Sequence, residues 1–322
     1  MTSNRVTEFG FAAKHDAPIA YLPRIRTYYE ALGYGAPYEW AHCADVPFRP
    51  LSKPLSQCRV ALITTAAPYR PDFGDQGPGA PYNARAKFFT VYSGDTALDH
   101  DLRISHVAID RTHTTGEDLA AYFPLAALRQ CVASGRIGSV APRFHGAPTH
   151  RSHRVTLEVD GPEILARCLA DEVDAAILVP NCPVCHQTVG LTARLLEESG
   201  ICTVVMGCAK DIVEYVGVPR FVFSDFPLGN SAGRPKDRES QIFTLELALK
   251  VLESASAART TVQSPLRWSA GAEWKLDYCN IDRLSAEEIK RRRAEFDEGK
   301  VQAKRARVEG GIVGPGPRDE IV

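Results

Sequence analysis

The chain lacks the features that would assign it to a membrane or to nucleic acid. No apolar stretch in its 322 residues approaches the roughly 18 uninterrupted residues of a membrane span. Its 38 basic residues are balanced by 39 acidic ones, so no positive excess points to nucleic acid or to an anionic membrane. The N-terminus has no basic region followed by an apolar one, and we therefore expect a cytoplasmic protein.

Common nucleotide and hydrolase motifs are also missing. The glycine-rich stretches form neither GxGxxG nor GxxxxGK[ST], and there is no GxSxG elbow. The nine cysteines are odd in number and show no regular framework, which suits a reducing compartment better than secretion. What remains is the composition of an ordinary enzyme that binds a small molecule.

The most informative feature present is the CxxC formed by Cys182 and Cys185. It follows an apolar run at 175–180 and precedes an amphipathic stretch at 189–199. A strand that ends in CxxC and enters a helix puts two thiols at a helix N-terminus, where unpaired N–H groups and the dipole favour a thiolate. The pattern therefore predicts a redox or nucleophilic pair, against the alternatives of buried structural thiols or half of a zinc site.

The rest of the chain alternates between helix and strand patterns. Strands are expected at 59–65, 87–92, 175–180, 202–206 and 221–223, and helices at 22–32, 124–134, 161–172, 189–199, 209–216 and 238–257. Such alternation predicts an α/β fold with parallel sheet layers of Rossmann-like type. We expect an N-terminal lead-in (1–57), two α/β subdomains (58–160 and 161–260) and a C-terminal extension with a charged helix and a flexible tail (261–322).

Several chemically useful side chains directly follow predicted strands. In parallel sheets ligands bind beyond the carboxyl ends of the strands. Cys182, Cys185, Cys208 and Asp225 all occupy such positions and are expected to share one crevice. The long Gly- and Pro-rich segment at 70–86 is predicted to be either functional or disordered.

Histidines are dense between residues 100 and 186. His106 and His145 stand out because each ends a strand-like or turn-like segment, and Asp110 belongs to the same polar cluster as His106. Histidine titrates near neutrality and is suited to acid and base work. His186 is a candidate partner of one thiol, or a solvent-facing imidazole at the start of a helix.

Two other uses of the cysteines remain open. Cys182, Cys185 and His186 with Cys208 or Cys202 would make a zinc set, although the second CxxC or HxxxH half of specific zinc signatures is missing. Such a chain would be a zinc-stabilised or non-catalytic subunit. Alternatively, Cys182 or Cys185 would work with Cys208 as acid and base of a cofactor-independent racemase or lyase.

Several blocks in order resemble one protein family. They lie at 59–66, 101–106 with Asp110, 123–125 with Leu128, 135–143, the CxxC and its helix, 200–201, 218–220, and 227–230 with Gly233 and Pro235. Together they resemble the component B selenoproteins of glycine, sarcosine and betaine reductases and the related small subunit of D-proline reductase. The resemblance covers roughly residues 55 to 255.

This resemblance implies reductive cleavage of a carbon–heteroatom bond in a small amino-acid-like substrate. In the family a selenocysteine and a cysteine form the redox pair, and the matching positions are Cys182 and Cys185. Sulfur in place of selenium raises the pKa and weakens the nucleophile, so local electrostatics must supply more activation. The resemblance also implies a partner reductase subunit with a pyruvoyl group that holds an amine; this chain itself supplies no cofactor.

The resulting hypothesis is a dithiol reductase. Cys182 attacks the substrate, Cys185 resolves the intermediate as a disulfide, and an external dithiol or thioredoxin-like protein restores the pair. His106 is assigned to proton transfer and Arg143 to the substrate carboxylate, because Arg offers a planar two-pronged donor. Asp110, His145, His186 and Asp225 complete the expected substrate site. We expect a homo-oligomer that binds no metal, nucleic acid or membrane.

Overall fold

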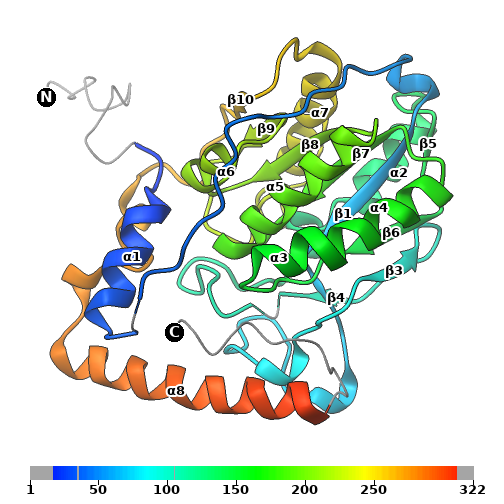
Figure 1. Cartoon of the computed structure of the whole chain (residues 1–322). Helices are drawn as coiled ribbons and strands as arrows, with labels where there is room; N and C mark the ends of the chain where they lie inside the picture. The colour runs from blue at the N-terminus through cyan, green and yellow to red at the C-terminus, as the bar shows by residue number, and fades with distance from the viewer. Residues whose placement is uncertain (1–16, 35, 105, 310–322) are drawn as a thin grey trace, which may run out of the picture.

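The computed structural model describes residues 17–34, 36–104 and 106–309. Its centre is one eight-stranded sheet with the order β10-β9-β8-β7-β1-β6-β3, in which β5 pairs with the start of β1 (Figure 1). Among the described strands of this sheet, only β3, at the edge, runs antiparallel to its neighbour. The strands are β1 (Arg59–Thr64), β3 (Tyr92–Asp95), β5 (Ser139–Val140), β6 (Arg143–Gly146), β7 (Ala175–Val179), β8 (Cys202–Gly207), β9 (Arg220–Phe223) and β10 (Thr260–Gln263). The predicted α/β fold with a parallel sheet is confirmed.

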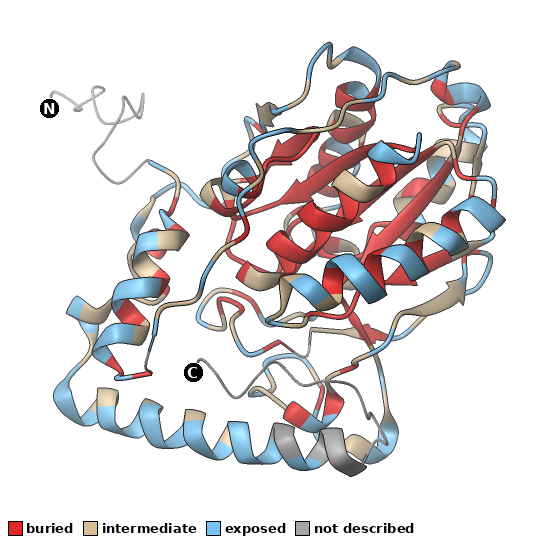
Figure 2. Cartoon of the chain, in the orientation of Figure 1, coloured by how far each residue is buried: buried red, intermediate tan, exposed pale blue. Residues whose placement is uncertain are grey.

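Helices cover both faces of this sheet. On one face α4 (Gly161–Ala170), α5 (Pro183–Glu198) and α6 (Lys210–Val216) pack against a set of strand side chains that includes Ala61 and Ile63. On the other face α2 (Leu125–Ala133) and α7 (Arg238–Ser254) pack against the alternate set, which includes Val60 and Leu62. Because neighbouring strand residues point to opposite faces, a strand buried on both needs an unbroken apolar run. The central strands therefore lie entirely within the buried interior (Figure 2).

A helix near each end of the described chain lies at the periphery, and the two meet where the first one ends. These are α1 (Tyr21–Ala31) and α8 (Ala286–Glu309), which runs past it along the lower edge of Figure 1. The rings of Tyr34 and Phe296 stack with centroids 3.9 Å apart, and Arg293 donates to the carbonyl of Leu32 over 2.8 Å. Both helices were predicted, whereas the Gly- and Pro-rich tail after α8 lies outside the described residues.

Three expectations differ from the structure. The helix after the CxxC begins at Pro183, not near 189, because proline at the first position and the Cys182 cap start it early. Residues 87–91 are not a strand: β3 begins at Tyr92, whose hydroxyl donates to the carbonyl of Ala66 over 2.6 Å. The two expected subdomains share one sheet, because β1, in the first, pairs with β7, in the second, along five residues.

The long segment at 70–86 is ordered by side-chain amides. Gln76 binds both the N–H and the carbonyl of Arg70, and Asn83 donates to the carbonyls of Phe73 and Asp75. These bonds replace the regular ladder that a loop of this length lacks. Within the described ranges, no helix combines the length and apolar character needed to cross a membrane.

Candidate active site

The CxxC lies at the point where β7 ends and α5 begins. Cys182 is the N-cap of α5 in an extended conformation, and Pro183 occupies the first helical position. The Cys182 sulfur accepts the N–H of Cys185 over 3.4 Å, in place of the usual hydroxyl or carboxylate cap. The sequence thus makes the cap itself a thiol, and that thiol faces the positive end of the helix.

The two sulfurs lie in contact within a buried cluster. Cys182 Sγ and Cys185 Sγ are 2.9 Å apart, and the hydroxyl of Thr149 is 3.0 Å from Cys185 Sγ. Cys185 is completely buried, while Cys182 keeps 4 % of its surface exposed. Formation of a disulfide therefore needs only small side-chain movements, because both cysteines already share one helical turn.

The surroundings place the negative charge of the pair on Cys185. Burial alone would raise the pKa of Cys185, but the hydrogen bond from Cys182, the charge of His106 and the hydroxyl of Thr149 lower it well below its ordinary value. Burial, the hydrogen bond and the charge of Cys185 raise the pKa of Cys182 well above its ordinary value. The surroundings thus favour the thiolate form at Cys185 over the thiolate form at Cys182.

His106 completes this cluster. One ring nitrogen of His106 and the two sulfurs all lie within 4.8 Å of one another. The ring is 8 % exposed, and its Nδ1 has no hydrogen-bond partner among the described residues. The guanidinium of Arg111 holds the segment in place by donating to the carbonyls of His106 and Val107 over 2.6 and 2.9 Å. The neighbouring Ser105 lies outside the described residues.

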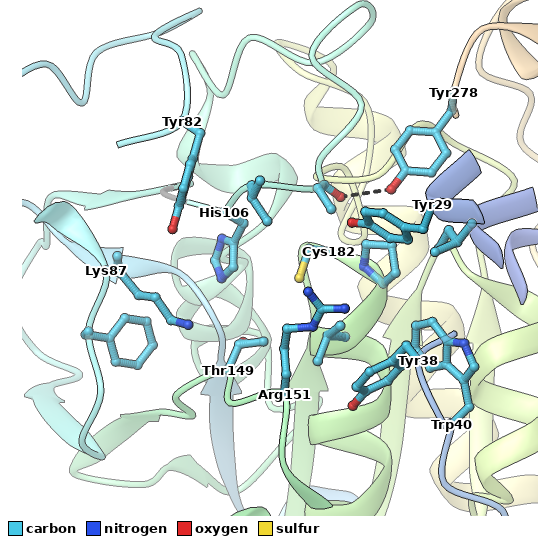
Figure 3. Close-up of a pocket in the computed structure, with 17 residues that line it drawn as sticks. Tyr29, Tyr38, Trp40, Tyr82, Lys87, His106, Thr149, Arg151, Cys182 and Tyr278 are labelled. Carbon is cyan, nitrogen blue, oxygen red and sulfur yellow. Dashed lines mark hydrogen bonds between the residues drawn. The ribbon is translucent and has the colours of Figure 1, made fainter. Parts of the chain in front are cut away.

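A cavity of about 90 Å³ opens above Cys182. Its walls come from α1, the segment after α1, the loop at 82–88, the segment at 106–108, the turn after β6, and Tyr278 (Figure 3). Six of the described lining residues are Tyr, Trp or Phe, and the Tyr278 hydroxyl donates to the carbonyl of Ala108 over 3.3 Å. Segments far apart in the sequence, from α1 to Tyr278, therefore take part in closing the space over the cysteines.

Among the described residues that line the cavity, Arg151 and Lys87 are cationic. Arg151 lies over the rings of Tyr38 and Tyr29, at 5.3 and 5.8 Å from their centroids, and Figure 3 shows its guanidinium pointing toward the sulfur of Cys182. Lys87 also lines the cavity, over the ring of Phe89. The described lining contains no acidic side chain, so the cavity favours an anion with an apolar body.

The expected substrate residues divide into those near the pair and those elsewhere. His186 adjoins the cysteines, but both of its ring nitrogens are occupied: Nδ1 bonds the carbonyl of Cys182 over 2.8 Å, and Nε2 accepts from the N–H of Cys208 over 2.9 Å. Burial lowers its pKa to about 4, which keeps it neutral. His186 therefore fixes the backbone around the CxxC and is unsuited to be a base or a zinc ligand.

The other expected residues do not line the cavity. Arg143 is the first residue of β6 and pairs with Asp171 over 2.8 Å. It therefore lies where the parallel strands begin, whereas the cysteines lie where they end. His145 is fully buried against Ser93, and Asp225 pairs with Lys275 beside a different cavity. Asp110 lies behind the cavity, where its N–H donates to the carbonyl of Leu228 and burial raises its pKa to about 6. The expected carboxylate role of Arg143 is thus corrected, because its guanidinium is already paired elsewhere.

Thr149 and Arg151 are the site residues that sequence reasoning missed. Both follow β6, a strand too short and too polar to be recognised from its pattern. Had Arg143–Gly146 been assigned as a parallel strand, its carboxyl end would have pointed to residues 147–151. The aromatic walls carry no such signal, because nothing in the sequence shows that α1 and Tyr278 reach the same space.

Comparison with known proteins relates the chain to a reductase subunit. It is 29% identical over 225 residues to D-proline reductase subunit gamma of Acetoanaerobium sticklandii, a match that covers 69% of this chain and 89% of that protein. No family model matches the sequence, and no solved structure matches it. The chain is therefore a distant homologue of a subunit from a multi-subunit reductase.

Proposed function

We propose that this protein is a thiol-dependent reductase of small carboxylates that works through a Cys182/Cys185 dithiol. The observation that carries the proposal is the pair of sulfurs 2.9 Å apart beneath a cavity that only Cys182 of the two enters. The similarity to a D-proline reductase subunit supports the same reaction class. The cationic, aromatic lining supports an amino-acid-like substrate with a carboxylate.

The proposed reaction transfers two electrons from the thiols to the substrate. The proton of Cys182 moves to Cys185, and the freed Cys182 thiolate attacks the carbon that bears the heteroatom. The carbon–heteroatom bond breaks, and the heteroatom leaves with its electron pair and takes up the proton held by Cys185, which becomes a thiolate again. The Cys185 thiolate then attacks the Cys182 sulfur, the sulfur–carbon bond breaks, and the carbon leaves with that pair and is protonated. The dithiol has become a disulfide.

The neighbouring side chains have matching roles in this scheme. His106 carries protons between Cys185 and the departing groups, since it lies within 4.8 Å of both sulfurs. Thr149 donates a hydrogen bond to the Cys185 thiolate and thereby stabilises the charge on the resolving sulfur. Arg151 replaces Arg143 as the proposed carboxylate ligand, because its guanidinium faces the cavity.

The scheme needs two contributions from outside the chain. An external dithiol or a thioredoxin-like protein returns two electrons to the disulfide. For an amine substrate, a carbonyl such as a pyruvoyl group on a partner subunit would activate the carbon toward attack. The similarity to one subunit of a larger reductase supports such a partner.

The two-cysteine racemase has less support from the geometry. That reaction needs acid and base thiols on opposite sides of one substrate. Cys208 is buried against Ser231 and is not among the described residues that line the cavity, and burial raises its pKa to about 12. The reductase scheme uses only thiols that already contact each other.

The test is anaerobic thiol counting with a panel of amino-acid-like carboxylates that includes D-proline. The reduced protein is incubated with each compound, with and without a chemical dithiol, and free thiols are counted. A substrate should consume two thiols and leave a Cys182–Cys185 disulfide. Cys185→Ser should instead accumulate a thioether on Cys182, whereas Cys131→Ser, on α2, should behave as wild type. Product formation that persists in Cys182→Ser would contradict the proposal.

A further inference from the structure

The cluster that forms the proposed redox site also has the composition of a metal centre. Two thiols and an imidazole, within 4.8 Å of one another, offer three ligand atoms of the kinds that zinc prefers. The three residues are all buried and come from two separate segments, the start of α5 and the stretch before Val107. The CxxC spacing alone suggested His186 as the third ligand, but the structure supplies His106.

A second observation concerns the burial of the His106 imidazole. The His106 ring is 8 % exposed, and its Nδ1 has no hydrogen-bond partner among the described residues. A buried nitrogen without a partner is costly, and native structures rarely keep one unless it has a use. By contrast, His186 satisfies both of its nitrogens with backbone groups.

We propose that the reduced protein binds one thiophilic divalent cation, of the zinc class, through Cys182, Cys185 and His106. Two cysteines and one histidine with an open fourth position is a ligand set known from catalytic zinc sites. Cys182 lines the cavity, so the fourth position faces it and is filled by water or by an anion from solution. This binding goes beyond the reductase function and does not require it.

The two sulfurs need to move only a little to bind one zinc ion. Two thiolates on one tetrahedral zinc ion lie roughly 3.8 Å apart, as Zn–S bonds of about 2.3 Å require. The sulfurs are now 2.9 Å apart, so they must separate by about one ångström. Cys182 has room for this movement because its sulfur borders the cavity. Binding transfers no electrons, and because both sulfurs bind as thiolates, the proton held by Cys182 is released to solvent.

The bound cation and the redox chemistry exclude each other. A disulfide has no thiolate to offer, so the oxidised protein does not bind the ion. Conversely, both sulfurs are occupied in the metal-bound protein, which neither attacks a substrate nor oxidises. The cation thus acts as a reversible inhibitor that protects the dithiol.

The experiment is a cobalt titration of the full-length, reduced protein without oxygen. Co²⁺ is used because thiolate ligation and tetrahedral geometry give distinct absorption bands, and Zn²⁺ is then added to displace it. Wild type should bind one equivalent with thiolate charge-transfer bands that Zn²⁺ abolishes. Cys182→Ser and Cys185→Ser should lose those bands, and His106→Gln should weaken binding at least about tenfold.

Matched controls separate this site from adventitious binding. Cys131→Ser removes a half-buried thiol outside the cluster and should bind as wild type. Since a cluster variant could fail to fold, a second measurement uses wild type alone: oxidation to the disulfide should abolish binding, and reduction should restore it. Unchanged bands in Cys182→Ser, or equal binding by the oxidised protein, would overturn the proposal. None of these readouts needs turnover, so their outcome is independent of the reductase activity.

Discussion

At the scale of single residues, the chemistry of the site depends on where one proton resides. Cys182 borders the cavity, while Cys185 lies beneath it and receives hydrogen bonds and the charge of His106. The surroundings therefore favour a proton on the accessible sulfur and the negative charge on the shielded one.

Cys182 should nevertheless be the first cysteine to react with iodoacetamide at pH 7. It is the member of the pair that the reagent reaches, and transfer of its proton to Cys185 exposes a thiolate. Burial raises the pKa values of Cys168 and Cys202 to about 12, so these should label at least about tenfold more slowly. Peptide mass spectrometry over time measures the order. Faster labelling of Cys185 would reverse the two roles.

Arg151 should control carboxylate affinity. Removal of a charge-assisted hydrogen bond costs about 1.5–3 kcal/mol, so Arg151→Gln should weaken carboxylate binding roughly 10- to 100-fold, and Arg151→Lys should weaken it less. Quenching of Trp40, which lines the same cavity, reports binding without turnover. Arg154→Gln, which removes an exposed pair with Glu158, is the control. Equal affinities for the Arg151 and Arg154 variants would remove Arg151 from the site.

His145 should make stability depend on pH. Burial lowers its pKa to about 4 in the folded protein, against about 6.5 when unfolded. Between these values the unfolded chain binds more protons, so stability falls as the pH falls. The full contribution to the free energy of unfolding is present above pH 6.5. At pH 5 about 2 kcal/mol of it is lost.

Denaturant unfolding at pH 7.5 and pH 5 tests this prediction. Between these two pH values, the free energy of unfolding of His145→Gln should fall by about 2 kcal/mol less than that of wild type. His42→Gln, at an exposed position, serves as the control. A parallel loss in wild type and His145→Gln would show that His145 does not titrate as its burial implies.

At the scale of elements, the two ends of α5 have different tasks. The first turn holds the cysteines, and the last turn holds Glu197, which pairs with Arg220 over 2.6 Å at full burial. Glu197 also accepts the N–H groups of Thr203 and Arg49, each over 2.6 Å. The ion pair thus joins α5, β8, β9 and the N-terminal segment, and the CxxC turn rests on a helix anchored at its far end.

Arg220→Leu should therefore cost about 3–5 kcal/mol of unfolding free energy, because it leaves the Glu197 carboxylate buried and unpaired. The double variant Glu197→Leu/Arg220→Leu should recover part of that loss. Arg26→Gln breaks an exposed pair with Glu30 and should cost less than about 1 kcal/mol. Denaturant unfolding measures all three. A single-variant loss no larger than that of Arg26→Gln would contradict this account of the anchor.

The burial of an element decides whether the sequence predicts it. The helices and strands from 161 to 254 show strong apolar patterns because both faces of the sheet are covered there, and they were predicted within a few residues except at the start of α5. By contrast, β6 and β10 are four-residue strands near or at the sheet edges, with few apolar side chains of their own. Missing β6 also hid Thr149 and Arg151.

At the scale of the whole molecule, the ends of the chain complete the site. The sheet brings the CxxC to its rim, but α1 contributes Tyr29 and the segment after it contributes Tyr38 and Trp40 to the cavity. No local pattern records such long-range packing, which explains why the sequence suggested a lead-in and a tail without chemistry. The CxxC with His106 was foreseeable from the order of motifs, whereas the aromatic walls were not.

The contact between α1 and α8 should set the mobility of the cavity wall. Phe296→Ala removes the ring stacked on Tyr34 and should speed amide exchange in Tyr21–Ala31 by about tenfold, without change in Ala175–Val179. Hydrogen exchange with mass spectrometry measures both segments. Gln302→Ala, farther along the exposed face of α8, is the control. Equal exchange in wild type and Phe296→Ala would show that α8 does not hold α1.

The central claim is that Cys182 and Cys185 form the redox couple of this protein. A redox titration of the full-length chain against a thiol–disulfide buffer, with alkylation and peptide mapping at each point, tests it most directly. The account predicts one reversible two-electron transition in which two of the nine thiols disappear and a single Cys182–Cys185 disulfide forms. A transition that leaves these two thiols free, or that pairs either of them with another cysteine, would contradict it.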